Sequence, residues 1–135
     1  MVDKYIKSNM CMLPWTSLET RPSGEYKPCC LYEGHLKDTK GKDFNTRTHS
    51  IVDVMRSQAM QELRESFKRG EKPSGCESCW KEEATGKTSK RQHMWYKAPA
   101  LGQMHISKDY VEPRFIDLKL GNICNLKCRI CGSWS

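Results

Sequence analysis

Apolar residues recur with a helical period in the middle of the chain. Met60, Leu63 and Phe67 follow the i, i+3, i+7 spacing that places side chains on one face of a helix. Ser57 is a suitable N-cap for this helix, because its hydroxyl can accept a hydrogen bond from a free backbone N–H in the first turn. The pattern therefore predicts a helix over 58–69 that packs against a core through this face.

Two segments have strand patterns. Near the C-terminus, Ile116, Leu118 and Leu120 alternate with charged residues, which predicts a strand over 114–120. Near the N-terminus, residues 11–30 contain the turn sequence Arg-Pro-Ser-Gly between two short segments, which predicts a β-hairpin. The sequence therefore indicates a mixed α+β fold.

The remaining segments are short and polar. Residues 33–49 are interpreted as a loop. Further helices are predicted from near residue 51, over 76–84 and over 89–97, and residues 99–113 are interpreted as a linker punctuated by Pro99 and Gly102.

The composition predicts a small core and a cytoplasmic location. The chain has 135 residues, of which 37% are hydrophobic and 29% charged, and its mean hydropathy is −0.76. No apolar run approaches the roughly 18 residues that span a bilayer, so no membrane partner is expected. The first ten residues lack the apolar region of a signal peptide.

The eight cysteines are too many for an ordinary cytosolic domain of this length. Without an export signal, clustered cysteines are more typical of metal sites than of disulfides. Metal binding would also supply folding free energy that a small apolar core cannot.

The formal net charge of +7 does not by itself indicate nucleic-acid binding. Two iron–sulfur clusters held by seven thiolates would remove about three of these charges. The remaining excess is spread along the chain, and the run from Lys87 to Arg91 is interpreted as a solvated face.

Three cysteines follow the C-terminal strand with the spacing C-x3-C-x2-C: Cys124, Cys128 and Cys131. Three thiolates on a loop can bind three irons of a cubane, whereas a fully ligated cubane uses four. The fourth iron would then be open to an external ligand. The alternative is a zinc site, for which the nearest fourth ligands, His105 and Cys30, have no characteristic spacing.

This motif after a first strand resembles the radical S-adenosylmethionine (SAM) superfamily. The resemblance implies that Cys124, Cys128 and Cys131 hold a [4Fe–4S] cluster whose free iron chelates SAM and whose electron cleaves it to a 5′-deoxyadenosyl radical. Ile130 would then occupy the position near adenine that is commonly aromatic in the family.

The upstream cysteines resemble a second family feature. Cys11, Gly24 and Cys29 give C-x12-G-x4-C, and Cys76 and Cys79 follow as C-x2-C. This pattern is similar to SPASM and Twitch domains, which carry auxiliary [4Fe–4S] clusters. The resemblance implies four ligands, Cys11, Cys29, Cys76 and Cys79, although the cysteines alone fit structural zinc about as well. Cys30 is the one cysteine outside both ligand sets, and it is interpreted as a small buried residue or an alternate ligand.

Together these resemblances predict a Twitch-like domain over 1–98 and, after the linker, the first strand and cluster loop of a truncated radical SAM (β/α) barrel over 114–135. The whole protein would be an enzyme, and this part alone would be inactive. The implied partners are SAM, an electron donor such as a flavodoxin or ferredoxin, and a peptide or small-molecule substrate. The competing hypothesis is a non-catalytic zinc or iron–sulfur module, with nucleic acid as a conceivable partner.

Overall fold

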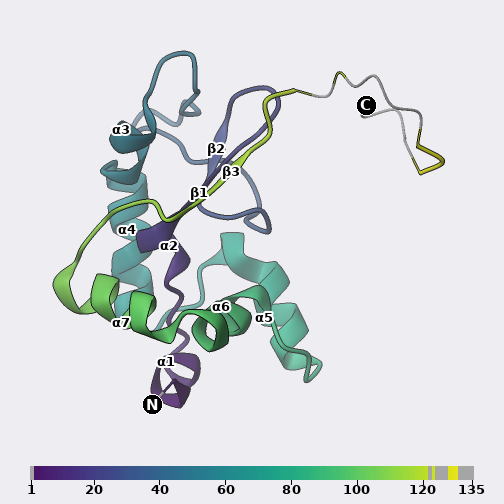
Figure 1. Ribbon diagram of the computed structural model, residues 1–135. Coiled ribbons are helices and arrows are strands. Elements are labelled where there is room, and N and C mark those ends of the chain that lie inside the picture. The colour runs from purple at the N-terminus through teal and green to yellow at the C-terminus, as the bar shows by residue number, and fades with distance from the viewer. Residues whose placement is uncertain (1, 122, 124–127, 131–135) are drawn as a thin grey trace.

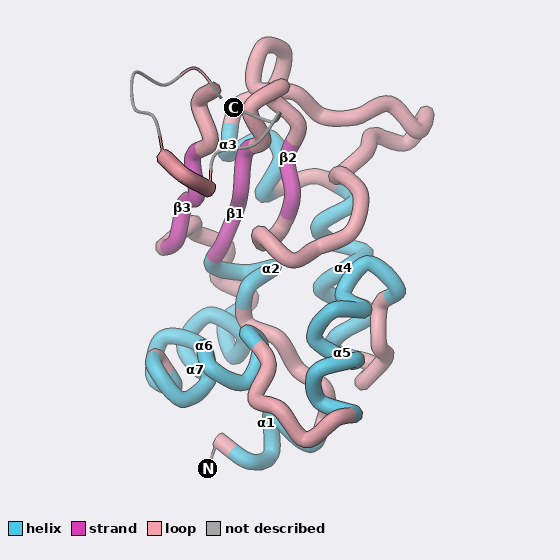
Figure 2. The backbone as a smooth tube through the Cα atoms, turned by 90° about the vertical axis from the view of Figure 1, so that its right-hand side faces the viewer, coloured by secondary structure: helices cyan, strands magenta, loops and turns pink. Residues whose placement is uncertain are grey.

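The computed structural model describes residues 2–121, 123 and 128–130. None of the helices in this described part is long and apolar enough to cross a membrane. Figure 2 shows three strands side by side at one end of the molecule and most of the helices at the other. The elements are α1 Asp3–Lys7, α2 Leu13–Thr16, β1 Ser17–Thr20, β2 Tyr26–Lys27, α3 Ile51–Met55, α4 Gln58–Lys68, the short 3-10 helix η1 Ser74–Cys76, α5 Glu77–Ala84, α6 Lys90–Lys97, α7 Pro99–Lys108 and β3 Phe115–Leu118.

The predicted N-terminal hairpin is present as β1 and β2. These strands pair antiparallel, with Glu19 opposite Lys27. The Gly24 N–H donates to the Arg21 carbonyl at 2.8 Å, and Gly24 has φ +99°. Glycine is favoured at this position because side-chain-bearing residues rarely adopt such a φ. The Asn45 side chain also lies against it, since a Cβ here would be 2.5 Å from Asn45 Oδ1.

The C-terminal strand β3 joins this hairpin. It pairs parallel with β1, with Ser17 opposite Phe115, and the strand order is β2-β1-β3. All four residues of β3 are exposed. The sequence pattern predicted this strand but not its partner, because pairing between segments 98 residues apart leaves no local signal.

Helix α4 forms and packs as its periodicity predicts. The Ser57 hydroxyl accepts from the Met60 N–H, and Met60, Leu63 and Phe67 are buried. They join a core that includes Trp15 on α2. Its other large, fully buried side chains include Trp95, Tyr26, Met12, Leu18 and Met55. Figure 1 shows α4 beside the sheet and α7 passing below α2.

The segment interpreted as a linker contains a ten-residue helix, α7. Pro99 is the first residue of α7, where its missing N–H costs no helical hydrogen bond. Gly102 is buried, and a Cβ at this position would lie 2.6 Å from Trp95 Cζ3 and 2.7 Å from Met12 Cε. The two residues that suggested a break are therefore the ones that start the helix and let it pack closely.

Gly102→Val should destabilise the protein, because its side chain would overlap Trp95 and Met12. We expect the free energy of unfolding to fall by about 2–3 kcal/mol in urea titration. Gly121→Val is the control, since a Cβ at Gly121 has no neighbour within 4 Å, and it should change stability by less than about 0.5 kcal/mol. Equal stability of the two variants would contradict the close packing of α7.

Candidate metal centre

Four cysteine side chains meet at one cavity of about 20 Å³. The exposed lining of this cavity is apolar, and side chains from distant parts of the sequence form its wall. The cysteines are Cys11, Cys29, Cys76 and Cys79, and the other lining residues are Leu13, Leu31, Tyr32, Phe67, Trp80 and Arg91. These four cysteines are the set that the sequence assigned to the auxiliary cluster.

Local structure explains how each thiol reaches the cavity. Cys11 precedes α2 and Cys29 follows β2, so the β1–β2 hairpin brings them together. Cys76 ends η1 and Cys79 lies in the first turn of α5. A separation of three residues places Cys76 and Cys79 on the same side of the helix start. The C-x2-C spacing thus presents two thiols in one direction.

Burial raises the pKa of three of the four thiols, which favours their neutral forms. Burial raises the pKa of Cys11 well above its ordinary value, and the neighbouring thiols Cys29, Cys76 and Cys79 add to this shift. Burial and the same kind of neighbours raise the pKa of Cys76 to about 12. Because thiolates repel one another in an apolar site, a cation is needed to hold several of them together.

The spacing of the sulfurs differs from that around a single bound zinc ion. Among the described residues, no three cysteine sulfurs lie within 4.8 Å of one another. Four thiolates on one zinc ion at 2.3 Å would be roughly 3.8 Å apart. In a cubane each thiolate binds a different iron, so the sulfurs stand further apart. The apolar wall and the four free thiols fit a metal group bound by thiolates, either an iron–sulfur cluster or a zinc ion.

Arg91 is a cavity residue that the sequence interpretation missed, since its basic run was assigned to a solvated face. Its side chain is only 2% exposed. Nε and Nη2 donate to the two carboxylate oxygens of Glu83 at 2.9 and 2.8 Å, and Nη1 donates to the Met10 and Ile6 carbonyls. The guanidinium lies 5.2 Å from the centre of the Trp80 ring. No local pattern marks this residue, because its partners lie up to 85 positions away.

Cys30 lies outside the cavity lining and has a partner of its own. Lys90 Nζ donates to Cys30 Sγ at 2.9 Å. Burial acts to lower the pKa of Lys90, but the hydrogen bond to Cys30 and the nearby thiols hold it above the ordinary value. Cys30 is half-buried rather than packed as a buried apolar residue. The structure thus separates two adjacent cysteines into different environments.

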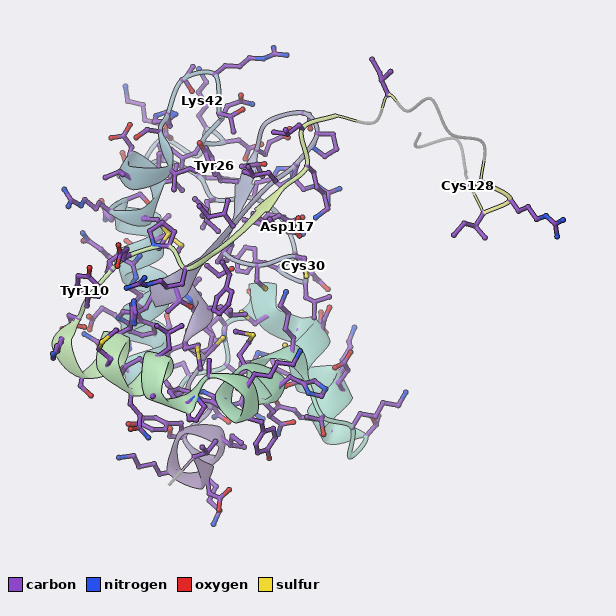
Figure 3. The ribbon with its side chains drawn as sticks, viewed as in Figure 1. Tyr26, Cys30, Lys42, Tyr110, Asp117 and Cys128 are labelled. Atoms are coloured by element: carbon purple, nitrogen blue, oxygen red, sulfur yellow. The ribbon has the colours of Figure 1, made fainter. Side chains whose placement is uncertain are left out.

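The C-terminal motif is only partly within the described residues. Cys128 is exposed and Ile130 is 88% exposed, whereas Cys124 and Cys131 lie outside the described residues. Figure 3 shows Cys128 on the segment beyond β3 and Cys30 beside the helices. His105, considered as a fourth zinc ligand, is fully buried, and its Nδ1 lies 2.9 Å from the Leu101 carbonyl. Among the described residues, His105 is thus a buried side chain and Cys30 already accepts a hydrogen bond from Lys90.

Comparison with known families identifies the cysteine module. A model of the SPASM iron–sulfur cluster-binding domain matches residues 11–80, just over half of the chain and all four cavity cysteines. The chain belongs to the SPASM family of iron–sulfur cluster-binding domains. No curated protein and no solved structure gives a significant match.

The division between Cys29 and Cys30 predicts different effects of their removal. Cys29→Ser should lose about four irons per chain after anaerobic reconstitution, because a cavity ligand is removed. Cys30→Ser is the matched control and should keep its iron, because Cys30 does not line the cavity. Iron and sulfide assays provide the measurement. Equal losses in the two variants, or loss in Cys30→Ser alone, would contradict the ligand set.

Arg91→Lys tests the guanidinium at the cavity, since lysine keeps the charge but not the two-pronged hydrogen bonds. We expect the free energy of unfolding to fall by about 2–3 kcal/mol and iron loss to a chelator to become faster. Arg69→Lys is the control, because Arg69 makes the same pairing with Glu71 at an exposed site. A similar effect in both variants would show that burial of Arg91 does not matter.

Proposed function

We propose that the chain is the auxiliary-cluster module and the beginning of the catalytic core of a radical SAM enzyme. Cys11, Cys29, Cys76 and Cys79 would hold the auxiliary [4Fe–4S] cluster. The observation that carries this proposal is the meeting of four free thiols in one apolar cavity. Membership of an iron–sulfur cluster-binding family supports it independently.

The proposed SAM site follows β3. Cys124, Cys128 and Cys131 would hold a second [4Fe–4S] cluster, with Ile130 beside the adenine of SAM. When bound, this cluster supplies the electron that cleaves SAM to a 5′-deoxyadenosyl radical. The exposed Cys128 and Ile130 are open to such ligands. In parallel α/β enzymes, loops at the carboxyl ends of strands carry the chemistry, and this motif follows the carboxyl end of β3 in the sequence.

The rest of the chain would position these groups. Arg91 would hold the wall of the auxiliary cavity through its ion pair with Glu83 and its hydrogen bonds to the carbonyls of Ile6 and Met10. The apolar wall would limit the access of water to the cluster. The proposed partners are SAM, a one-electron donor such as a flavodoxin or ferredoxin, and a peptide or small-molecule substrate.

Metal analysis of anaerobically prepared protein tests the proposal. We expect a brown sample that contains about eight irons and eight sulfides per chain, corresponding to two cubanes. A colourless sample with two zinc ions would overturn the proposal in favour of a structural zinc module. About four irons would support the auxiliary cluster alone and contradict the C-terminal one.

Cys128→Ala should remove about four irons and leave the upstream cluster in place, because the two sites share no cysteine. SAM should alter the EPR signal of the reduced wild-type protein but not that of this variant, since only the three-cysteine site has an open iron. Cys30→Ser is the matched control and should retain the SAM-dependent change. Loss of all iron from Cys128→Ala would contradict the independence of the sites.

A further inference from the structure

The segments around Leu36 and Phe44 pair with each other and with the start of β2. The Leu36 N–H donates to the Tyr26 carbonyl at 2.8 Å, and the Phe44 N–H donates to the Leu36 carbonyl at 3.0 Å. The side chains of Tyr26, Leu36 and Phe44 are all buried in the core. The loop predicted over 33–49 thus contains an ordered hairpin that continues from β2.

The residue before each of these core residues carries a possible metal ligand. Successive side chains in extended segments point to opposite faces, so Glu25, His35 and Asp43 share the face away from the core. One ligand atom from each lies within 4.8 Å of the other two, and His35 Nδ1 is 3.2 Å from Asp43 Oδ2. All three residues are half-buried.

The polar surroundings of these three residues leave a carboxylate oxygen without a donor. Asp43 Oδ1 is shielded from solvent and accepts no hydrogen bond. Its nearest cation is Lys37 Nζ, which lies 3.7 Å away. This ion pair is loose, and the Lys37 side chain is exposed. Glu25 accepts from the Ser23 hydroxyl. Two carboxylates at this separation repel each other, and a divalent cation would neutralise both.

Backbone contacts hold the ligand frame in place. The Asp38 carboxylate accepts from the Lys40 and Lys42 N–H groups at 2.8 and 2.9 Å and closes the hairpin turn. The backbones of Lys37 and Asp43 form an antiparallel β-bridge across the turn. Figure 3 shows Lys42 at the outer end of this hairpin and Tyr26 nearer the sheet. The ligands thus stand on a hydrogen-bonded frame rather than on a free loop.

We propose that Glu25, His35 and Asp43 form a binding site for a divalent cation, separate from the cysteine cavity. One imidazole and two carboxylates suit Mn²⁺, Fe²⁺ or Zn²⁺, whereas the thiols of the cavity select softer metals and iron–sulfur clusters. The cation would displace Lys37 from Asp43 and provide the missing partner of Oδ1. This site does not depend on the proposed SAM chemistry.

Titration of the iron-loaded protein with Mn²⁺ tests the site, because free aqueous Mn²⁺ has an EPR signal that is lost on binding. We expect one saturable Mn²⁺ per chain. His35→Ala and Glu25→Gln should each weaken the affinity at least about 10- to 100-fold. His93→Ala and Glu33→Gln are the matched controls, since both residues are exposed and outside the site, and they should bind as the wild type does.

Lys37→Met separates a metal site from a simple cluster of ion pairs. Removal of the competing cation should tighten Mn²⁺ binding several-fold. Iron content and circular dichroism of each variant establish that the fold and the cysteine cavity are intact. The proposal is overturned if intact wild-type protein shows no saturable Mn²⁺ binding, or if the His35 and Glu25 variants bind as tightly as their controls.

Discussion

The buried ion pair between Arg91 and Glu83 connects the segments that surround the four thiols. Glu83 belongs to α5, which carries Cys79, while the remaining Arg91 donors bind carbonyls just before Cys11. Burial of a guanidinium is costly unless its donors are satisfied and its charge is paired. Arg91 meets both conditions only when α5, α6 and the chain before α2 are assembled together. The cavity is therefore a product of tertiary assembly, and the motif alone does not form it.

The start of α6 also distinguishes the two adjacent cysteines. Lys90 donates to Cys30, whereas the next residue, Arg91, lines the cavity that Cys29 enters. Neighbouring side chains diverge, so Lys90 meets Cys30 while Arg91 pairs with Glu83 at the cavity. Burial is the main cause that raises the pKa of Cys29, and the Leu31 N–H and the charge of Lys90 only partly offset it, so this thiol would gain from a bound metal.

Local sequence signals predicted most elements and failed where distant contacts decide. Serine caps at Ser57 and Ser89 begin helices α4 and α6 in the structure, because capping depends only on residues within one turn. Gly102 suggested a break, yet contact with Trp95 makes its small size an advantage inside α7. The family resemblance implied that Cys76 and Cys79 belong to one site, whereas the burial of Arg91 depends on partners that no short pattern records. The assignment of the four thiols as cluster ligands remains a prediction.

Strand β1 relates the cavity to the C-terminal motif in a single sheet. It pairs with β2, which leads to Cys29, and with β3, which leads to the C-x3-C-x2-C sequence. Glu19 on β1 is only 1% exposed, and its carboxylate pairs with Lys119 just after β3. A shift of β3 by one residue would turn Lys119 to the other face and leave a buried carboxylate without its closest cation. Such a buried charge pair therefore favours one register, and that register determines where the chain after β3 begins relative to the hairpin.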